Sequence, residues 1–310
     1  MVRGQTKITP SHLSRRALVY VRQSSLAQVR DNARPNPHYF HYGAGVTLYS
    51  FVSNQFTGFH HMVMPGTDRD SFYILGGPIE NQTSVSPVQF ISDTAGSSET
   101  IFGLFWLMGF LYRPRLADLD EARFWRLDAD ADYGFLNDLA RHLANAKVIV
   151  DNWDDLLRVA GSLKTGKVQP MDLIRSLRSG SRLTSLGAAI AELGRLPKTL
   201  HNLAFIAKDE IYRRAILTAL NHGETRNKLA RKVFHGQKGE LRQRYREDQE
   251  DQLGALGLVV NIIVLWNTRY MEAALDPPTG DRLRCTRGGR SAAHPAHLGA
   301  HRTARSVRVP

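Results

Sequence analysis

The chain has 310 residues, of which 42% are hydrophobic and 9% aromatic, enough to bury one large core or two smaller ones. No apolar run reaches the roughly 18 to 20 residues that a membrane span needs, and the N-terminus has no signal-peptide pattern. The single cysteine, Cys285, excludes an internal disulfide framework and a cysteine-rich zinc site. We therefore expect a cytoplasmic protein with no membrane partner.

The formal net charge of +12 favours an anionic partner such as nucleic acid. The charge is concentrated at the two ends of the chain. Residues 1–31 carry six Lys and Arg against one acid, and residues 276–310 carry seven Arg against two acids. Because the long middle region is close to neutral, basicity alone is weak evidence that this region binds DNA.

The first part of the chain predicts strands and two helices. Ala17–Val21 is a short β-branched and aromatic run, and Arg34–Pro37 cannot be helical. In chain order we then expect strands at Gly45–Ser53 and His60–Pro65, a helix at Ser71–Glu80, a strand at Val88–Ser92 and an apolar helix at Ser97–Gly109. This order predicts a mixed α/β sheet with helices on its faces.

From about residue 117 the apolar residues recur at helical spacing, interrupted at glycines and prolines. The predicted helices are Asp138–Ile149, Asp154–Leu163, Met171–Leu177, Leu186–Leu196, Thr199–Leu220, Thr225–Phe234 and Gly239–Ala274. The four tryptophans lie in apolar patterns and are expected in the core. Residues 276–310 have no periodicity, which predicts a disordered basic tail and is consistent with a frameshift near Pro277.

Two acids stand out by position. Asp93 directly follows the predicted strand Val88–Ser92, where carboxylates of open α/β sheets commonly face a ligand crevice, although it could instead cap the next helix. Glu224 precedes the predicted helix Thr225–Phe234, where an acid is also favoured by the helix dipole. His60 and His61 alternate along a strand, and packing or solvation is expected for them rather than metal binding.

A long colinear series of motifs resembles the catalytic domain of the class II, replicative transposases of the Tn-three family. The motifs are Asn36–Phe40, Gly43–Thr47, Gly58–His60, Pro65–Thr67, Arg69–Ser71, Asp93–Gly96, Phe102–Trp106, Arg113–Asp118, Asn152–Leu157, Ala160–Lys164, His235–Arg246, Gln252–Val260 and Leu265–Thr268. The resemblance covers residues 33–275, with a helical insertion at about 117–220.

The resemblance implies an RNase H-like fold with an Asp, Asp, Glu active site. In the family these acids hold two divalent ions, Mg²⁺ or Mn²⁺, for DNA strand cleavage and transfer. The second Asp corresponds to Asp93 and the Glu to Glu224, with Glu240 as the nearest competing acid. Lys238, Arg242, Arg244 and Arg246 form a basic group that either contacts DNA phosphates or pairs with the acids at 247, 248 and 250.

The first Asp of the family motif, expected shortly before Asn36, is absent. In its place Ile8–Gln28 resembles the N-terminus of a serine recombinase or resolvase, in which Ser24 would be the nucleophile and Arg22 a phosphate contact. Only this fragment of the recombinase is represented, which makes both residues vestigial. The predicted units are therefore a recombinase-like fragment at 1–32, a truncated transposase catalytic domain at 33–275 and the tail.

The expected function is that of a truncated transposase with weak or absent metal binding and no catalysis. Residual salt-sensitive DNA affinity is expected, and full-length transposase or a second copy is a candidate partner. Three alternatives stay open: a non-catalytic fragment that binds DNA or interferes with intact transposase, a product that does not fold stably, and a working recombinase that forms a covalent DNA adduct through Ser24.

Overall fold

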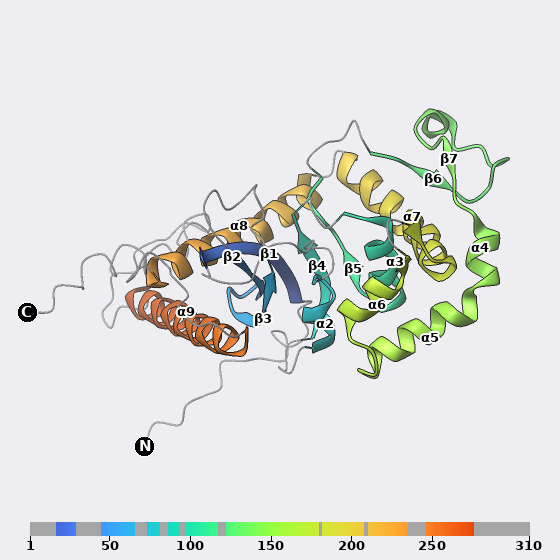
Figure 1. Cartoon of the computed structure of the whole chain (residues 1–310). Helices are drawn as coiled ribbons and strands as arrows, with labels where there is room; N and C mark the ends of the chain where they lie inside the picture. Colours follow the sequence, from blue (N-terminus) through green and yellow to red (C-terminus); the bar gives the residue numbers. More distant parts are fainter. Residues whose placement is uncertain are drawn as a thin grey trace, which may run out of the picture.

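The computed structural model describes residues 17–28, 45–65, 73–80, 86–93, 97–116, 122–179, 182–207, 210–234 and 246–275. Its centre is a five-stranded sheet with helices on both faces (Figure 1). The strands are β1 (Ala17–Gln28), β2 (Gly45–Ser53), β3 (Gly58–Pro65), β4 (Pro87–Ser92) and β5 (Leu111–Tyr112), in the spatial order β3-β2-β1-β4-β5. The expected mixed α/β sheet is confirmed.

The central strand of this sheet is β1. It pairs antiparallel with β2 and parallel with β4, so that Val21 lies opposite Phe51 on one side and Ser92 on the other. The β2–β3 pair is antiparallel and the β4–β5 pair is parallel. The predicted strand Ala17–Val21 is thus confirmed but too short, and it belongs to the same sheet as the strands that follow it.

Both faces of β4 are covered, as its almost continuously apolar sequence requires. Phe90 and Ile91 are fully buried and adjacent, so they face opposite sides of the sheet. The Phe90 ring lies 5.2 Å from the ring of Phe105 in α3 (Glu99–Leu107). Ile91 packs instead against Ile216, Ala219 and Leu220 of α8 (Glu210–Val233). The two helices therefore enclose the sheet.

The helical region follows β5. Its elements are the strands β6 (Trp125–Arg126) and β7 (His142–Leu143), the 3-10 helix η3 (Gly134–Asp138), the helices α4 (Ala146–Asp151), α5 (Trp153–Lys164) and α6 (Pro170–Ser176), the hairpin β8 (Arg178–Ser179) and β9 (Arg182–Leu183), and α7 (Ser185–Ile206). The short helix α2 (Gly76–Glu80) lies before β4, and α9 (Arg246–Leu275) ends the described region.

Helices α3 and α7 cross in close contact at two glycines. A Cβ atom on Gly194 of α7 would collide with the carbonyl oxygen of Glu99 and lie 2.6 Å from the backbone nitrogen of Gly103. A Cβ on Gly103 would in turn collide with the carbonyl oxygen of Ile190. Glycine at both positions is therefore what lets the backbones of the two helices touch.

Four helix predictions are wrong. The predicted helix Thr199–Leu220 is divided, because α7 ends at Ile206 and α8 begins at Glu210. Residues 138–149 form the end of η3, the strand β7 and the start of α4, which Asn145 caps through Val148. The predicted break at Pro197 is absent because α7 is held to α3 on both sides of the proline, by Gly194 and by the 2.6 Å bond from Lys198 to Glu99. The break at Gly223 is also absent, since this glycine is buried within α8.

The prediction that the four tryptophans are buried in the core is wrong for three of them. Only Trp125 is buried, whereas the exposed fractions of Trp106, Trp153 and Trp266 are 49%, 38% and 51%. The apolar helices carry more hydrophobic residues than their buried faces can hold.

Helix α9 also corrects an expectation. Residues Asp248–Ala274 are long and apolar enough, by length and composition, to cross a membrane. One face of α9 is nevertheless buried against α8 and β3, in a cluster with Val63 and Leu229. The apolar run Leu253–Trp266, which is shorter than a membrane span and would be expected in a buried core, is buried on that face alone.

A buried histidine joins α7, α8 and the chain that follows β5. His201 is 4% exposed, and its Nε2 lies 2.9 Å from the carbonyl oxygen of Pro114. Because a carbonyl oxygen only accepts, Nε2 donates and Nδ1 accepts from the Tyr212 hydroxyl at 2.8 Å. Burial lowers the pKa of His201 to about 4. The ring is therefore neutral at physiological pH.

We expect the stability of the protein to fall in mild acid because of His201. The unfolded chain takes up a proton near pH 6.5, whereas the folded protein resists protonation until pH 4, so stability present above pH 6.5 is lost as pH falls through that window. The loss attributable to this residue is about 3 kcal/mol at most. Urea unfolding at several pH values should show a weaker acid dependence in His201→Gln than in the unaltered protein. Identical pH profiles would contradict the expectation.

Candidate functional site

The first candidate acid, Asp93, lies at the carboxyl end of β4, as predicted. Its side chain is exposed, while Ser92 before it is buried. The Ser92 hydroxyl donates to the carbonyl oxygen of Asp93 at 2.9 Å, so the Tyr112 hydroxyl, 2.6 Å away, donates to Ser92. Burial raises the pKa of Tyr112, and the charge of Asp93 raises it further. This protonated tyrosine of β5 holds the end of β4, and with it the backbone of Asp93.

The alternative role of Asp93 as a helix cap is wrong. The N-cap of α3 is Ser98, whose side chain accepts a hydrogen bond from the backbone nitrogen of Ile101. The acid at the end of this strand therefore needs an explanation other than capping.

The second candidate acid, Glu224, lies in the middle of α8, and its expected place at the start of a helix is wrong. The position cannot be explained by the positive dipole at a helix N-terminus, because that effect is confined to the first turn. The side chain is partly exposed and lies 3.6 Å from the ammonium group of Lys228.

The two elements that carry these acids are in contact. Ile91, two residues before Asp93, packs against Leu220, and Glu224 follows Leu220 by one helical turn. Helix α8 runs across the face of the sheet formed by β1 and β4 (Figure 1). Asp93 and Glu224 therefore both lie near the contact between the sheet and helix α8.

On β1 a basic residue follows the last residue that pairs with β4. Val21 of β1 pairs with Ser92 of β4, and the residues that follow these two are Arg22 and Asp93. Arg22 and Ser24 also lie opposite Ser50 and Leu48 of β2. Within the described ranges no three His, Cys, Asp or Glu side chains are grouped closely enough to hold a metal ion. The described acids thus do not fit a site for two divalent ions.

The predicted DNA-binding group falls largely outside the described residues. Lys238, Arg242 and Arg244 lie there, as do the competing Glu240 and the tail 276–310. The backbone of Arg246 forms the first residue of α9.

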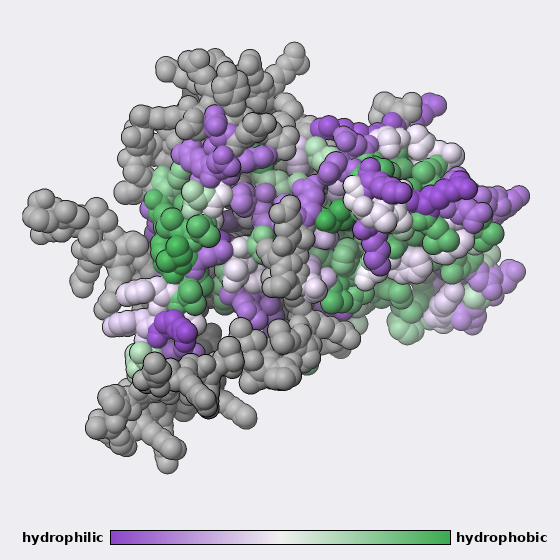
Figure 2. Space-filling view, turned by 90° about the horizontal axis from the view of Figure 1, so that it is seen from below, coloured by the Kyte–Doolittle hydropathy of each residue, from purple (hydrophilic) through white to green (hydrophobic). Residues whose placement is uncertain are grey.

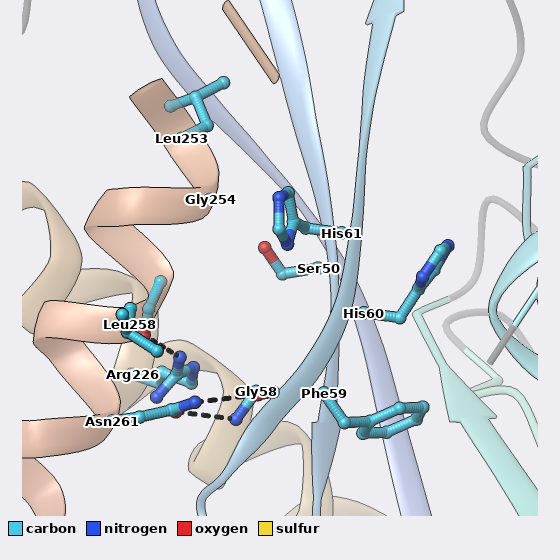
Figure 3. A pocket seen from close by; sticks show the side chains of 11 residues that line it. Ser50, Gly58, Phe59, His60, His61, Arg226, Leu253, Gly254, Leu258 and Asn261 are labelled. Atoms are coloured by element: carbon cyan, nitrogen blue, oxygen red, sulfur yellow. Dashed lines mark hydrogen bonds between the residues drawn. The ribbon is translucent and has the colours of Figure 1, made fainter. Parts of the chain in front are cut away.

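A pocket that the sequence did not reveal lies between the sheet and α9 (Figure 3). Arg226, two residues after Glu224, is buried there and donates to the carbonyl oxygens of Phe56 at 3.3 Å and Gly257 at 3.2 Å. Burial lowers its pKa to about 10, so it stays charged at neutral pH. The Asn261 amide bonds both the nitrogen and the oxygen of Gly58, at 3.0 and 2.9 Å.

These contacts join α8, the β2–β3 turn and α9. A Cβ on Gly58 would collide with the Arg226 guanidinium, which would then have to shift. His60 and His61, the adjacent histidines of β3, adjoin this region. His61 lines the pocket, and His60 lies 3.5 Å from Glu80. Sequence spacing gave no signal for the pocket, since its polar residues come from distant parts of the chain.

Comparison with known proteins gives consistent matches. Residues 23–287 match the family model described as Tn3 transposase DDE domain. The transposase for transposon gamma-delta of Escherichia coli (strain K12) is 55% identical over 244 residues, which cover 79% of this chain and 24% of that protein. The transposase for transposon Tn4556 of Streptomyces fradiae is 46% identical over 249 residues, covering 80% and 28%. The chain spans about a quarter of the length of these relatives.

Proposed function

The chain belongs to the Tn3 transposase family, within its DDE domain, and from this membership we propose that it keeps the framework of the catalytic domain without a complete set of catalytic acids. The observation that carries the proposal is the register of β1 and β4, in which the last pair, Val21 and Ser92, is followed along the two chains by Arg22 and Asp93. We also propose that residues 8–28 derive from the N-terminus of a serine recombinase, which they resemble.

An RNase H-like fold is the architecture we propose for the sheet. Three antiparallel strands followed by two parallel ones, in the order β3-β2-β1-β4-β5, support it. The family's first acid belongs on the first strand. We propose that the recombinase-like segment supplies most of β1, of which residues 23–28 also fall within the family match, and that it completes the sheet while contributing a different set of side chains.

Asp93 and Glu224 are proposed as the second and third acids. Their support is the end of β4 for Asp93 and the contact between β4 and α8 for Glu224. Two carboxylates bind a divalent ion more weakly than three. No cleavage step follows from this donor set, so we propose that the protein does not cut or join DNA.

DNA is the proposed partner, through phosphate contacts of Lys238, Arg242, Arg244 and Arg246. Four such contacts predict that affinity falls by about a hundredfold between about 50 and 200 mM salt. Filter binding with random duplex DNA at the two salt concentrations measures this fall.

Two variants that each lose four positive charges test whether these four residues contact the DNA. Replacing the four residues by glutamine should remove most of the binding at low salt. Replacing the exposed Arg158, Lys164, Lys167 and Arg178 of the helical region should leave it nearly unchanged. Absence of binding at low salt, or equal losses in both variants, would refute the proposed DNA contacts.

A further inference from the structure

Helix α9 has two apolar faces, and among the residues that the structure describes only one of them is packed against other elements. The inner face, Leu253, Leu256, Val260 and Val264, is buried against α8 and β3. The outer face carries Leu258, Ile262 and Leu265, whose exposed fractions are 63%, 58% and 61%. Figure 2 shows this region as an apolar patch over α9.

The outer face has the spacing of a coiled-coil seam. Its exposed residues follow one another at alternating intervals of four and three along the helix, the heptad pattern of a and d positions. They are Asp251, Ala255, Leu258, Ile262, Leu265 and Arg269, and we call this set the outer seam. No charged residue occurs from 252 to 268, so the middle of the seam is wholly apolar.

The patch is large enough to form an interface. Val259, Trp266 and Tyr270 are exposed beside the seam, and the Trp266 and Tyr270 rings stack with centroids 5.5 Å apart. Together with the seam they expose roughly 600 Å² of apolar surface, at the upper limit of what a monomer normally presents and near the area of one side of a standard interface.

We propose that the outer seam is a self-association site, at which two copies of this chain pair through α9 as an antiparallel coiled coil. Antiparallel helices bring the a positions of one chain opposite the d positions of the other. With the two-fold axis between Leu258 and Ile262, Leu258 meets Ile262 of the second copy. Ala255 then meets Leu265, a small side chain opposite a large one.

Charge complementarity selects the antiparallel orientation. The same alignment brings Asp251 of each copy opposite Arg269 of the other, at both ends of the apolar segment. A parallel pair would bring Asp251 opposite Asp251 and Arg269 opposite Arg269, which is repulsive. The exposed pair of Arg269 with Glu272, at 3.3 Å within the same helix, does not compete strongly.

A lipid bilayer is a poorer occupant for this face. Spanning a membrane would require α9 to leave its contacts with Val63 and Leu229, and to insert Asp248, Glu250 and Asp251 at one end. Pairing with a second copy retains all the internal contacts.

The first test measures the molecular mass of the purified chain by sedimentation equilibrium over about 1 to 100 µM. The unaltered protein should dimerise in this range, and Ile262→Lys should weaken dimerisation at least about tenfold by placing a charge in the apolar seam. Val150→Lys is the matched control, since Val150 is 71% exposed on α4 and lies off the seam. Circular dichroism verifies that each variant is folded.

The second test exchanges the terminal charges. Asp251→Arg and Arg269→Asp should each weaken the dimer about fivefold or more, and the double variant should restore it. In a parallel dimer the single changes would have little effect. The proposal is overturned if the protein is monomeric at all concentrations, if Ile262→Lys dimerises normally, or if the double exchange gives no recovery. Flotation of the monomer with phosphatidylcholine vesicles, lost in Ile262→Lys, would also overturn it in favour of a membrane surface.

Discussion

Replacing Arg22 by aspartate is expected to raise the affinity of the protein for Mn²⁺ at least about tenfold. The substitution replaces a positive charge by a negative one at the β1 position that follows Val21, the partner of Ser92, just as Asp93 follows Ser92 on the other chain segment. Even at the dielectric of a protein surface, two unit charges a few ångströms apart interact by about 1 to 4 kcal/mol, and 1.4 kcal/mol is a tenfold change in affinity. Titration calorimetry with Mn²⁺ measures the change.

Two control variants separate the possible causes of this result. Arg22→Gln removes the positive charge without adding an acid, and should give only part of the gain. Gln23→Asp adds an acid one register position along β1, and should give little. If Gln23→Asp binds Mn²⁺ as well as Arg22→Asp, the gain comes from general charge and the assignment of the strand position is wrong.

The same variants test catalysis. Nicking of DNA that carries the ends of a related transposon, in the presence of Mg²⁺ or Mn²⁺, should be undetectable in the unaltered protein. It should appear when β1 is replaced by the corresponding strand of a complete relative, and more weakly in Arg22→Asp. Nicking by the unaltered protein that depends on both a metal ion and Glu224 would contradict the proposed function, because it would require only two acids.

Gly194→Ala is expected to lower the free energy of unfolding by about 4 kcal/mol or more, the range in which single substitutions disrupt a core. The added methyl group would collide with backbone atoms of Glu99 and Gly103, and backbone cannot move aside as a flexible side chain can. Helices α3 and α7 would have to separate, which would open the cluster that includes Phe102 and Ile190. Urea unfolding followed by circular dichroism measures the loss.

A glycine in another helix provides the control. Gly161 lies in α5, and an added methyl group there would meet no atom within 4 Å beyond the local backbone of its own helix, so Gly161→Ala should be neutral or stabilise the protein by about 0.5 to 1 kcal/mol. A similar small effect at Gly194 would show that the two helices are not in backbone contact.

The four longer strands were largely predictable because they are rich in β-branched and apolar residues, whereas the two-residue strands β5 to β9 are too short to give a sequence signal. Gly45–Ser53 was predicted with its correct bounds, and β3 and β4 to within two residues. The role of β1 was not predictable. A short β-branched run indicates a strand, but its partners, Phe51 and Ser92, are specified only by packing of distant segments.

The helices were less predictable where long-range contacts overrode local preference. Pro197 and Gly223 normally interrupt helices, but here contacts with α3 hold the first in place, and burial between α8 and its neighbours holds the second. The periodicity of α9 predicted a helix but could not show which of its two apolar faces is buried.

Among the candidate site residues, Asp93 was the one whose place in the fold could best be predicted from the sequence. The place of Asp93 followed from the end of a buried strand, whereas Glu224 was assigned to a helix start that does not exist. Arg226 could not be anticipated at all, because a charged side chain within an amphipathic helix is normally solvated.

The central place of β1 has a consequence for handling the protein. If residues 17–28 were cleaved away, β2 and β4 would each lose their shared neighbour, and both would present unpaired backbone amides and carbonyls. Such bare strand edges are templates for pairing with other polypeptides. A preparation clipped in this segment should therefore precipitate as β-rich aggregates instead of persisting as a smaller soluble species.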